Sequence, residues 1–492
     1  MYDGKAEEIK VDQLPMEGVK DGSIMYHAER LAKWVVGLKY QDIPVDVVEK
    51  AKLCIYDWVC ITLYGADSPW SKALLEIVRE TGGRAESTIL AHKDLVPCSN
   101  AAMLNAIMAL SYDLSDTYPR VELHPSCSVI ASALAVAERE NTTGEDLITS
   151  VVAGYEVITR VASSMNRRPQ SFTAARGFEA NSIFPPFGAV VASGKLFSLN
   201  QEEMTNAIGL AGGSMGAATI DYLVDGNWTY RWNSARASHN GILNALMAKK
   251  GFVGPHAIFE GRWDSKGRFG VINALAGDMT FQEDLVDGLG ETWNIKEMAF
   301  KYYGCCHYNQ GYADGIIKLI KEHGFEAEDI DEITAYVPHF ALFLGVPREV
   351  KVKPKNLTIS QWSLPFILAT VIADGHLLNP KEQLSEKRLT DTRMLDLADK
   401  VKIERDRELD KAFMEDGIFK SPLKVRLKNG KEYEIASTCK GFSHNPLTGE
   451  EMDNKFDVLT SGVFNKEKRE RIKKELKTLE GIKSVSEWVR SW

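Results

Sequence analysis

The stretch from Tyr112 to Pro125 carries more potential chemistry than a connection between two helices requires. It reads Tyr-Asp-Leu-Ser-Asp-Thr-Tyr-Pro-Arg-Val-Glu-Leu-His-Pro, with two aspartates, a threonine, an arginine, a glutamate and a histidine. Apolar, alanine-rich runs at 100–111 and 126–138 flank it and predict buried helices. Polar groups between two core helices either cap those helices or form a site.

Two interpretations of this stretch differ in what they assign to its polar side chains. If the first helix continues through Asp113, then Asp113, Asp116 and Thr117 share one face at i, i+3 and i+4. His124 then re-enters the core before Pro125, a first-turn proline. In the structural interpretation, Asp116 and Thr117 are caps and His124 is a hydrogen-bonded core residue. In the functional one, His124 moves protons, because a histidine pKa lies near 7.

Size and charge exclude several classes of protein. The chain has 492 residues, which allows two or three domains or one large core with insertions. The net charge is −9 and no basic stretch is extended, which argues against a nucleic-acid partner. No apolar run reaches about 18 residues, and the first residues lack a signal layout. We therefore expect a cytoplasmic protein without a membrane partner.

Cysteine usage and the absence of cofactor motifs narrow the chemistry further. The seven cysteines are odd in number and mostly lie in apolar surroundings, which indicates reduced core thiols. The chain has no Cys-x-x-Cys, His-Glu-x-x-His, phosphate-loop or dinucleotide motif, so we expect no cofactor. A zinc site of Cys305, Cys306, His307 and His124 is disfavoured, because adjacent cysteines rarely both ligate one ion. A nucleophilic Cys306 lacks an evident base partner.

Hydrophobic periodicity predicts a mainly α protein, with a large all-helical domain and a smaller α+β domain. Residues 1–22 are polar and aperiodic and predict an arm. Residues 23–275 form the helical core domain, with helices predicted at 24–38, 45–65, 70–81, 100–111, 127–138, 144–165, 189–197 and 239–249. Residues 276–447 form the α+β domain, with strands at 330–337 and 401–403 and a hairpin around Asn429-Gly430. Residues 448–492 return to helix and to the core domain.

Several stretches, taken in order, resemble the MmgE/PrpD family, which includes 2-methylcitrate dehydratase, cis-aconitate decarboxylase and iminodisuccinate epimerase. They are Asp57 to Gly65, Asp113-Leu-Ser-Asp-Thr117 with His124-Pro125, Arg176-Gly177-Phe178 with Phe187-Gly188-Ala189, Gly241-Ile-Leu with Gly251-Phe-Val-Gly-Pro255 and Phe259-Glu-Gly261, Lys301 with Cys306, Gln361-Trp-Ser-Leu-Pro365, and Asn445-Pro-Leu-Thr448 with Lys455-Phe456.

This resemblance covers residues 25 to 460 and adds expectations that the residues alone do not give. It implies an all-helical domain with an α+β lid, a site between the two, and cofactor-free chemistry on small carboxylic acids. It also implies a homodimer.

Position by position, the match to the family's site is uneven. Asp113, Thr117 and His124 fall on its acidic-Thr-His constellation, with one extra residue before His124, and Lys301 falls on its lid-side lysine. Glu179 stands where the family usually has a histidine. Tyr230 and Asn233 stand where the family usually has a lysine and a histidine. After the lysine that matches Lys301, the family often has a proline, a cysteine, an arginine and a later histidine. The residues at those places in this chain are Gly304, Cys306, His307 and Gln310. These departures predict a divergent member.

Dehydration beside a carboxylate fits these residue types. A base removes the weakly acidic C–H proton, an acid protonates the departing hydroxyl, and cations hold the developing charge. We expect His124 to be the acid/base and Asp113 to orient it, while Thr117 and Lys301 bind or polarise the substrate.

The remaining candidates are assigned by residue type. Tyr230 or His307 is expected to supply a second proton-transfer group, and Arg120 and Arg231 to bind substrate carboxylates. Glu179 is a second carboxylate in the site, a helix cap or a partner of Arg176. Asn233, Cys306 and Gln361 complete the expected substrate-binding residues.

Decarboxylation or epimerisation uses the same residues, because both share an enolate-like intermediate. A non-catalytic carboxylate-binding paralogue is a further alternative. The small number of cations argues against a tricarboxylate substrate.

Overall fold

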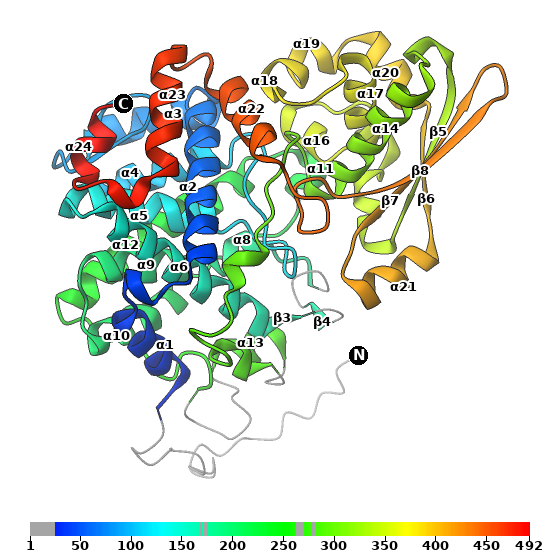
Figure 1. The fold of residues 1–492 in the computed structure, drawn as a ribbon. Coiled ribbons are helices and arrows are strands. Elements are labelled where there is room, and N and C mark those ends of the chain that lie inside the picture. The colour runs from blue at the N-terminus through cyan, green and yellow to red at the C-terminus, as the bar shows by residue number, and fades with distance from the viewer. Residues whose placement is uncertain (1–24, 168–169, 172–175, 262–269, 278–280) are drawn as a thin grey trace, which may run out of the picture.

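The computed structural model describes residues 25–167, 170–171, 176–261, 270–277 and 281–492. The predicted arm at 1–22 lies outside these residues. Figure 1 shows a large helical body and, beside it, a smaller part that contains the main sheet. The prediction of a mainly α protein with a smaller α+β part is confirmed.

The helical body is formed by segments from both ends of the chain. Its first helices are α1 (His27–Gly37), α2 (Val45–Gly65), α3 (Pro69–Thr81), α4 (Cys98–Ala109), α5 (Ser126–Glu140) and α6 (Gly144–Met165). They are followed by α8 (Ala180–Ile183), α9 (Pro185–Leu196), α10 (Gln201–Gly212), α11 (Tyr222–Asp225), α12 (Thr229–Lys249) and α13 (Val271–Ala276), with short strand pairs β1–β2 (Ser87–Thr88, Leu95–Val96) and β3–β4 (Asn166–Arg167, Gln170–Ser171).

Local signals fix where several of these helices begin. The Ser68 side chain accepts the N–H of Ser71 at the start of α3, and Pro69 takes the first helical position. Thr143 and Asp146 form a reciprocal capping box at the start of α6. These ends were predicted to within one or two residues.

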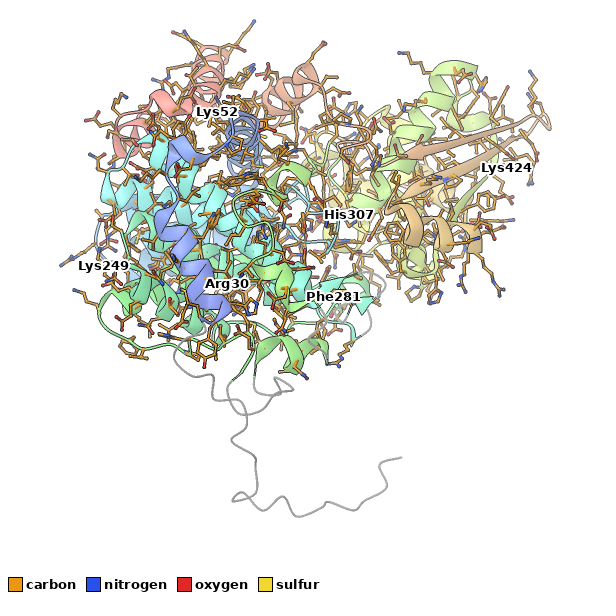
Figure 2. All side chains as sticks on the ribbon, turned by 60° about the horizontal axis from the view of Figure 1, so that its bottom comes forward. Arg30, Lys52, Lys249, Phe281, His307 and Lys424 are labelled. Carbon is orange, nitrogen blue, oxygen red and sulfur yellow. The ribbon has the colours of Figure 1, made fainter. Side chains whose placement is uncertain are left out.

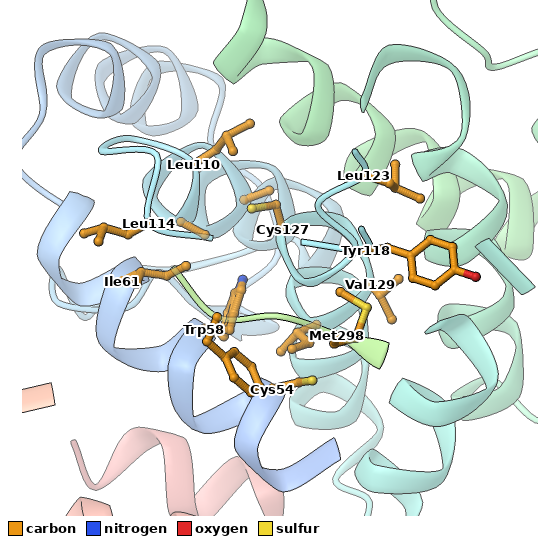
Figure 3. Packing of buried hydrophobic residues seen from close by; sticks show 14 of the residues in the cluster. Cys54, Trp58, Ile61, Leu110, Leu114, Tyr118, Leu123, Cys127, Val129 and Met298 are labelled. Atoms are coloured by element: carbon orange, nitrogen blue, oxygen red, sulfur yellow. The ribbon is translucent and has the colours of Figure 1, made fainter. Parts of the chain in front are cut away.

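Small residues let the central helices approach closely. An added Cβ at Gly188 of α9 would lie 2.7 Å from Val129 Cγ2 and 2.9 Å from Ile158 Cβ, so a side chain there would push α9 away from α5 and α6. The close-up in Figure 3 shows the apolar side chains of Trp58, Leu114 and Tyr118 gathered in the same interior. The Tyr112–Pro125 loop is therefore part of the core.

The smaller domain is a four-stranded sheet with helices. The strands β5 (Ile330–Val337), β6 (Val401–Arg405), β7 (Lys420–Leu427) and β8 (Glu432–Thr438) pair in the order β6-β5-β7-β8. Only β5 and β6 are parallel, with Ile333 opposite Val401. The helices are α14 (Gln310–His323), α15 (Arg348–Val352), α16 (Leu357–Gln361), α17 (Leu364–Asp374), α18 (Pro380–Gln383), α19 (Glu386–Leu389), α20 (Thr392–Asp399) and α21 (Arg407–Asp416).

Two helices are longer than their periodicity predicted. The helix predicted at 189–197 begins at Pro185, and the one predicted at 239–249 begins at Thr229. The early part of α12 buries Tyr230, Arg231 and Asn233. Because these buried positions hold polar side chains, the apolar repeat that predicts a helix is missing there. None of the described helices has the length and apolar character needed to cross a membrane.

The chain end packs against the helical body through α22 (Gly449–Thr460), α23 (Lys466–Lys477) and α24 (Val485–Arg490). A buried ion pair ties α22 to α2, with Lys455 Nζ 2.6 Å from Asp57 Oδ1. The same ammonium donates to the carbonyls of Leu114 (3.2 Å) and Lys301 (2.6 Å). One buried cation thus joins α22 to α2 and to the segments that carry Leu114 and Lys301.

Replacing Lys455 by methionine should destabilise the protein strongly, because it leaves the Asp57 carboxylate buried without its cation. Breaking a buried pair from one side costs about 3–5 kcal/mol. The matched control is Lys296→Met, which breaks an exposed pair with Asp46 and should leave the melting temperature unchanged. Equal melting temperatures for both variants would show that the buried pair does not stabilise the fold.

Candidate active site

The loop between α4 and α5 does not continue the first helix. Helix α4 ends at Ala109, and Asp113 has φ +53°, in the left-handed region that aspartate tolerates better than most residues. The predicted shared helical face of Asp113, Asp116 and Thr117 is therefore wrong. Each of these side chains instead takes its own direction from an irregular, fully buried backbone.

Asp116 holds the start of α5. Its Oδ1 accepts the N–H of Ser126 at 3.1 Å, and its Oδ2 accepts the hydroxyl of Tyr155 at 2.7 Å. Burial raises the pKa of Asp116 to about 6, against these two hydrogen bonds, which lower it. Asp116 is thus a cap, as the structural interpretation expects, whereas the side chain of Thr117, the other expected cap, contacts the His124 ring instead.

The His124 imidazole is held at Nδ1 by a backbone carbonyl rather than by a carboxylate. Its Nδ1 lies 2.6 Å from the carbonyl oxygen of Asp116 and 3.3 Å from Thr117 Oγ1, and its backbone N–H donates to Asn181 Oδ1 at 2.8 Å. A carbonyl only accepts, so Nδ1 carries the proton and Nε2 is the acceptor in the neutral ring. Burial, followed by the nearby Lys301 charge, holds the pKa of His124 well below its usual 6.5.

Asp113 faces the lid-side lysine. Its Oδ1 lies 2.5 Å from Lys301 Nζ and accepts the Tyr230 hydroxyl at 3.2 Å. Its Oδ2 has no hydrogen-bond partner among the described residues. The prediction that Asp113 orients His124 is therefore wrong, because this carboxylate is committed to Lys301 and Tyr230.

Backbone pairing carries Lys301 to this position. Thr117 and Ala299 exchange two hydrogen bonds of 2.9 Å, which join the segment before Lys301 to the loop that holds His124. On the other side, Phe300 donates its N–H to the carbonyl of Gly441 at 3.0 Å. The Lys301 ammonium is thus placed by backbone hydrogen bonds to Thr117 on one side and to Gly441 on the other.

Three aromatic rings form a wall beside the site. Tyr222, Tyr230 and Trp362 have ring centroids 4.8–5.0 Å apart, and the His124 ring lies 6.3 Å from that of Tyr230. The Tyr222 hydroxyl donates to Glu179 Oε2 at 2.6 Å. These rings come from α11, α12 and the lid.

Glu179 is a cap, one of its three expected roles. Its Oε1 accepts the backbone N–H of Asn181 at 3.0 Å and the Asn181 side-chain amide at 2.6 Å. Burial raises the pKa of Glu179. Because Asn181 also holds the His124 backbone, Glu179 supports the imidazole indirectly. The alternative partner Arg176 donates instead to the carbonyl of Leu275.

Neither arginine is free for a substrate, which corrects two predictions. Arg120 makes a two-point ion pair with Glu297, both contacts at 2.6 Å, and its side chain is 55% exposed. Arg231 is fully buried and donates to Ser111 O, Thr358 Oγ1 and Gln361 Oε1 at 2.7–3.1 Å. Burial lowers the pKa of Arg231 to about 10. Arg231 therefore joins the helical body to the lid.

The other predicted site residues are buried around these groups. Gln361 binds Arg231 and accepts the Cys306 N–H at its carbonyl (3.0 Å), while its Nε2 has no hydrogen-bond partner among the described residues. The same holds for Asn233 Nδ2. His307 lies where the helical body meets the smaller domain, as Figure 2 shows, with its ring 3.8 Å from that of Tyr308.

The cysteine neighbourhood has the chemistry of core thiols. Burial raises the pKa of Cys305 and Cys306, which keeps both as thiols rather than as nucleophilic thiolates. Within the described part of the chain, no group of three or more His, Cys, Asp or Glu residues is arranged to hold a metal ion.

Sequence reasoning missed the residues that act through others. Asn181, Tyr222 and the Asp57–Lys455 pair support the site by contacts across 43 to 398 positions of the chain. Spacing along the sequence gives no signal for such contacts. Only Asn181 has a local signal in the sequence. It stands two residues after Glu179, which is where a residue of the first helical turn lies relative to its cap.

Replacing Gly441 by alanine should displace Lys301. The new Cβ would lie 1.7 Å from the Phe300 carbonyl oxygen, so the backbone that carries the ammonium must move. Gly430→Ala is the matched control, because Gly430 has a similar positive φ (+83° against +89°) but open space around it. Strain alone costs of order 1–3 kcal/mol. Melting temperatures that fall equally in both variants would refute the predicted collision.

Comparisons with known proteins agree with this architecture. The model of the MmgE/PrpD N-terminal domain matches residues 29–283, and that of the MmgE/PrpD C-terminal domain matches residues 303–480. The chain is 26% identical, over 93% of its length and 95% of the relative's, to the cis-aconitate decarboxylase-like protein oryM of Aspergillus oryzae. It is 22% identical to the cis-aconitate decarboxylases of Aspergillus terreus and Homo sapiens, over 93% of its length and 94% and 92% of theirs. The chain belongs to the MmgE/PrpD family.

Proposed function

We propose that this protein is a cofactor-independent lyase that removes water from a small carboxylic acid. The observation that carries the proposal is the His124 ring, whose Nδ1–H is fixed by the Asp116 carbonyl and whose Nε2 is left as a base. The ring lies near the Lys301 ammonium, whose charge contributes to its low pKa. A base beside a cation suits proton abstraction next to a carboxylate.

The reaction needs only this one proton carrier. Nε2 of His124 takes the proton from the carbon next to the carboxylate, and the electron pair moves into an enediolate held by Lys301. The double bond then forms as the hydroxyl on the next carbon leaves. The imidazolium gives its proton to that hydroxyl, water departs, and His124 returns to the neutral form.

Neighbouring groups keep these two residues in place. Asp113 holds the Lys301 ammonium at 2.5 Å and accepts the Tyr230 hydroxyl at 3.2 Å, so Tyr230 belongs to the same hydrogen-bond network. Thr117 lies against Nδ1 and pairs with the segment that carries Lys301. Thr117 and Asp113 are therefore positioning residues in this proposal.

Decarboxylation is the second candidate, because the relatives that match along nearly their whole length are named cis-aconitate decarboxylases or decarboxylase-like. Loss of CO₂ leaves a carbanion that must be protonated, so His124 would have to enter this reaction as imidazolium. Analysis of products for an unsaturated acid of unchanged carbon number, or for CO₂, separates the two reactions. Binding of acids without any product would indicate a carboxylate-binding paralogue.

Replacing His124 by glutamine should abolish turnover while the protein stays folded. A positioned acid/base contributes roughly a hundred- to ten-thousand-fold, and glutamine can still donate to the Asp116 carbonyl. The control is His323→Gln, in the lid, where the ring stacks on Tyr433. Unsaturated-acid formation and melting temperature should be measured together. Full activity of the His124 variant would exclude this residue as the proton carrier.

The pH dependence distinguishes the two candidate reactions. The folded pKa of His124 is lowered well below 6.5, so the neutral base persists through neutral pH and is lost only at clearly lower pH. Dehydration should thus give a constant kcat/KM through neutral pH and a fall only at pH values well below 6.5. A decarboxylase that uses imidazolium should instead gain rate as the pH falls. A kcat/KM that rises on acidification would overturn the dehydratase proposal.

A further inference from the structure

The charge balance of the candidate site limits the acids that it can bind. A buried carboxylate is stable only when a cation or several hydrogen bonds compensate it. The number of cations near His124 that keep N–H donors unused by the described residues therefore limits the number of carboxylates that a substrate can place there.

Most buried cations around the site are fully used by the protein. Arg231 has three protein acceptors and stacks over the Trp70 ring at 3.9 Å. Lys455 has Asp57 and two carbonyls. Lys351, below the aromatic wall, donates to the carbonyls of Leu223 (2.7 Å) and Trp362 (3.1 Å), and burial lowers its pKa to about 8.

Lys301 is different, because the described residues give it a single hydrogen-bond partner, Asp113. An ammonium group has three N–H donors, so Lys301 can still bind a ligand oxygen. Its charge is already balanced by Asp113, however, and one substrate carboxylate makes this cluster anionic. A second carboxylate would add another negative group to a neighbourhood that already holds Glu179, which accepts hydrogen bonds from Tyr222 and Asn181 beside the same rings.

Unpartnered neutral donors complete the site. Asn233 Nδ2 and Gln361 Nε2 are buried and have no hydrogen-bond partner among the described residues. Asn233 lies about one helical turn from Tyr230 on α12, and Gln361 precedes Trp362 of the aromatic wall. Amide N–H groups match an uncharged oxygen, and the rings match an apolar group.

We propose that the site takes a carboxylic acid with one carboxylate and an uncharged remainder, and that it rejects tricarboxylates. The carboxylate binds Lys301, and the remainder packs against Tyr222, Tyr230 and Trp362. The side-chain amides of Asn233 and Gln361 donate hydrogen bonds to an uncharged oxygen. This substrate class rests on the proposed function, because it uses the same His124–Lys301 site. It also separates this chain from relatives whose names specify cis-aconitate, a tricarboxylate.

Binding tests the charge limit without requiring turnover. Benzylsuccinate and its monomethyl ester differ by one charge at nearly the same shape, and cis-aconitate carries three carboxylates. By calorimetry on the full chain, the monoester should bind severalfold more tightly than benzylsuccinate, and cis-aconitate most weakly. Lys301→Met should abolish monoester binding. The proposal is wrong if cis-aconitate binds most tightly, or if the monoester binds equally well to Lys301→Met.

A charge-removing variant tests the role of Glu179. Glu179→Gln keeps an acceptor for Tyr222 but removes the carboxyl group, so it should reduce the preference for the monoester over benzylsuccinate. Glu138→Gln is the matched control, since Glu138 is also a buried, hydrogen-bonded carboxyl group but lies at the far end of α5. An unchanged preference in Glu179→Gln would remove Glu179 from the argument and contradict the proposed repulsion.

Turnover then separates the substrate class from the reaction. We expect 3-hydroxy-3-phenylpropanoate, which has one carboxylate, to lose water. We expect 2-methylcitrate, which has three carboxylates, to remain unconverted. Turnover of 2-methylcitrate alone would contradict the substrate class while supporting the lyase. Tight binding of the monoester without turnover of either acid would support the substrate class and contradict the lyase.

Discussion

A buried ion pair between Asp113 of the helical body and Lys301 of the lid side governs the candidate site. Both side chains are 1% exposed, so neither charge has water to stabilise it. Each needs the other, and this need fixes how the Lys301 segment lies against the Asp113 loop of the helical body, at the place where His124 lies. The pair also supplies the positive charge that contributes to keeping the His124 ring neutral.

The rest of the architecture can be understood as support for this contact. Lys455 ties the Lys301 backbone to Asp57 on α2, and Arg231 ties α12 to the lid residues Thr358 and Gln361. Backbone pairing between Thr117 and Ala299 aligns the two halves of the site. Arg231 and Lys455 are used to hold segments of the fold together, which leaves a site with little spare positive charge.

The sequence predicted the framework well and the site only in part. Periodicity and caps located α2, α3, α6 and the β7–β8 hairpin, because those signals are local. Residue types and the family resemblance drew attention to His124, Asp113 and Lys301, whose roles stay predictions, but they could not say which acid faces which base. That choice depends on the left-handed turn at Asp113, which sends its carboxylate to Lys301 and leaves His124 to a backbone carbonyl. The domain limits, the homodimer and the cytoplasmic location stay predictions.

The most direct test concerns the protonation state of a single ring. Nitrogen-15 NMR of the histidine side chains, assigned with His124→Gln, reports which ring nitrogen carries the proton at neutral pH. We predict a neutral His124 ring with its proton on Nδ1 and an unprotonated Nε2. A doubly protonated ring, or a proton on Nε2 alone, would contradict the account of His124 as a base held by the Asp116 carbonyl.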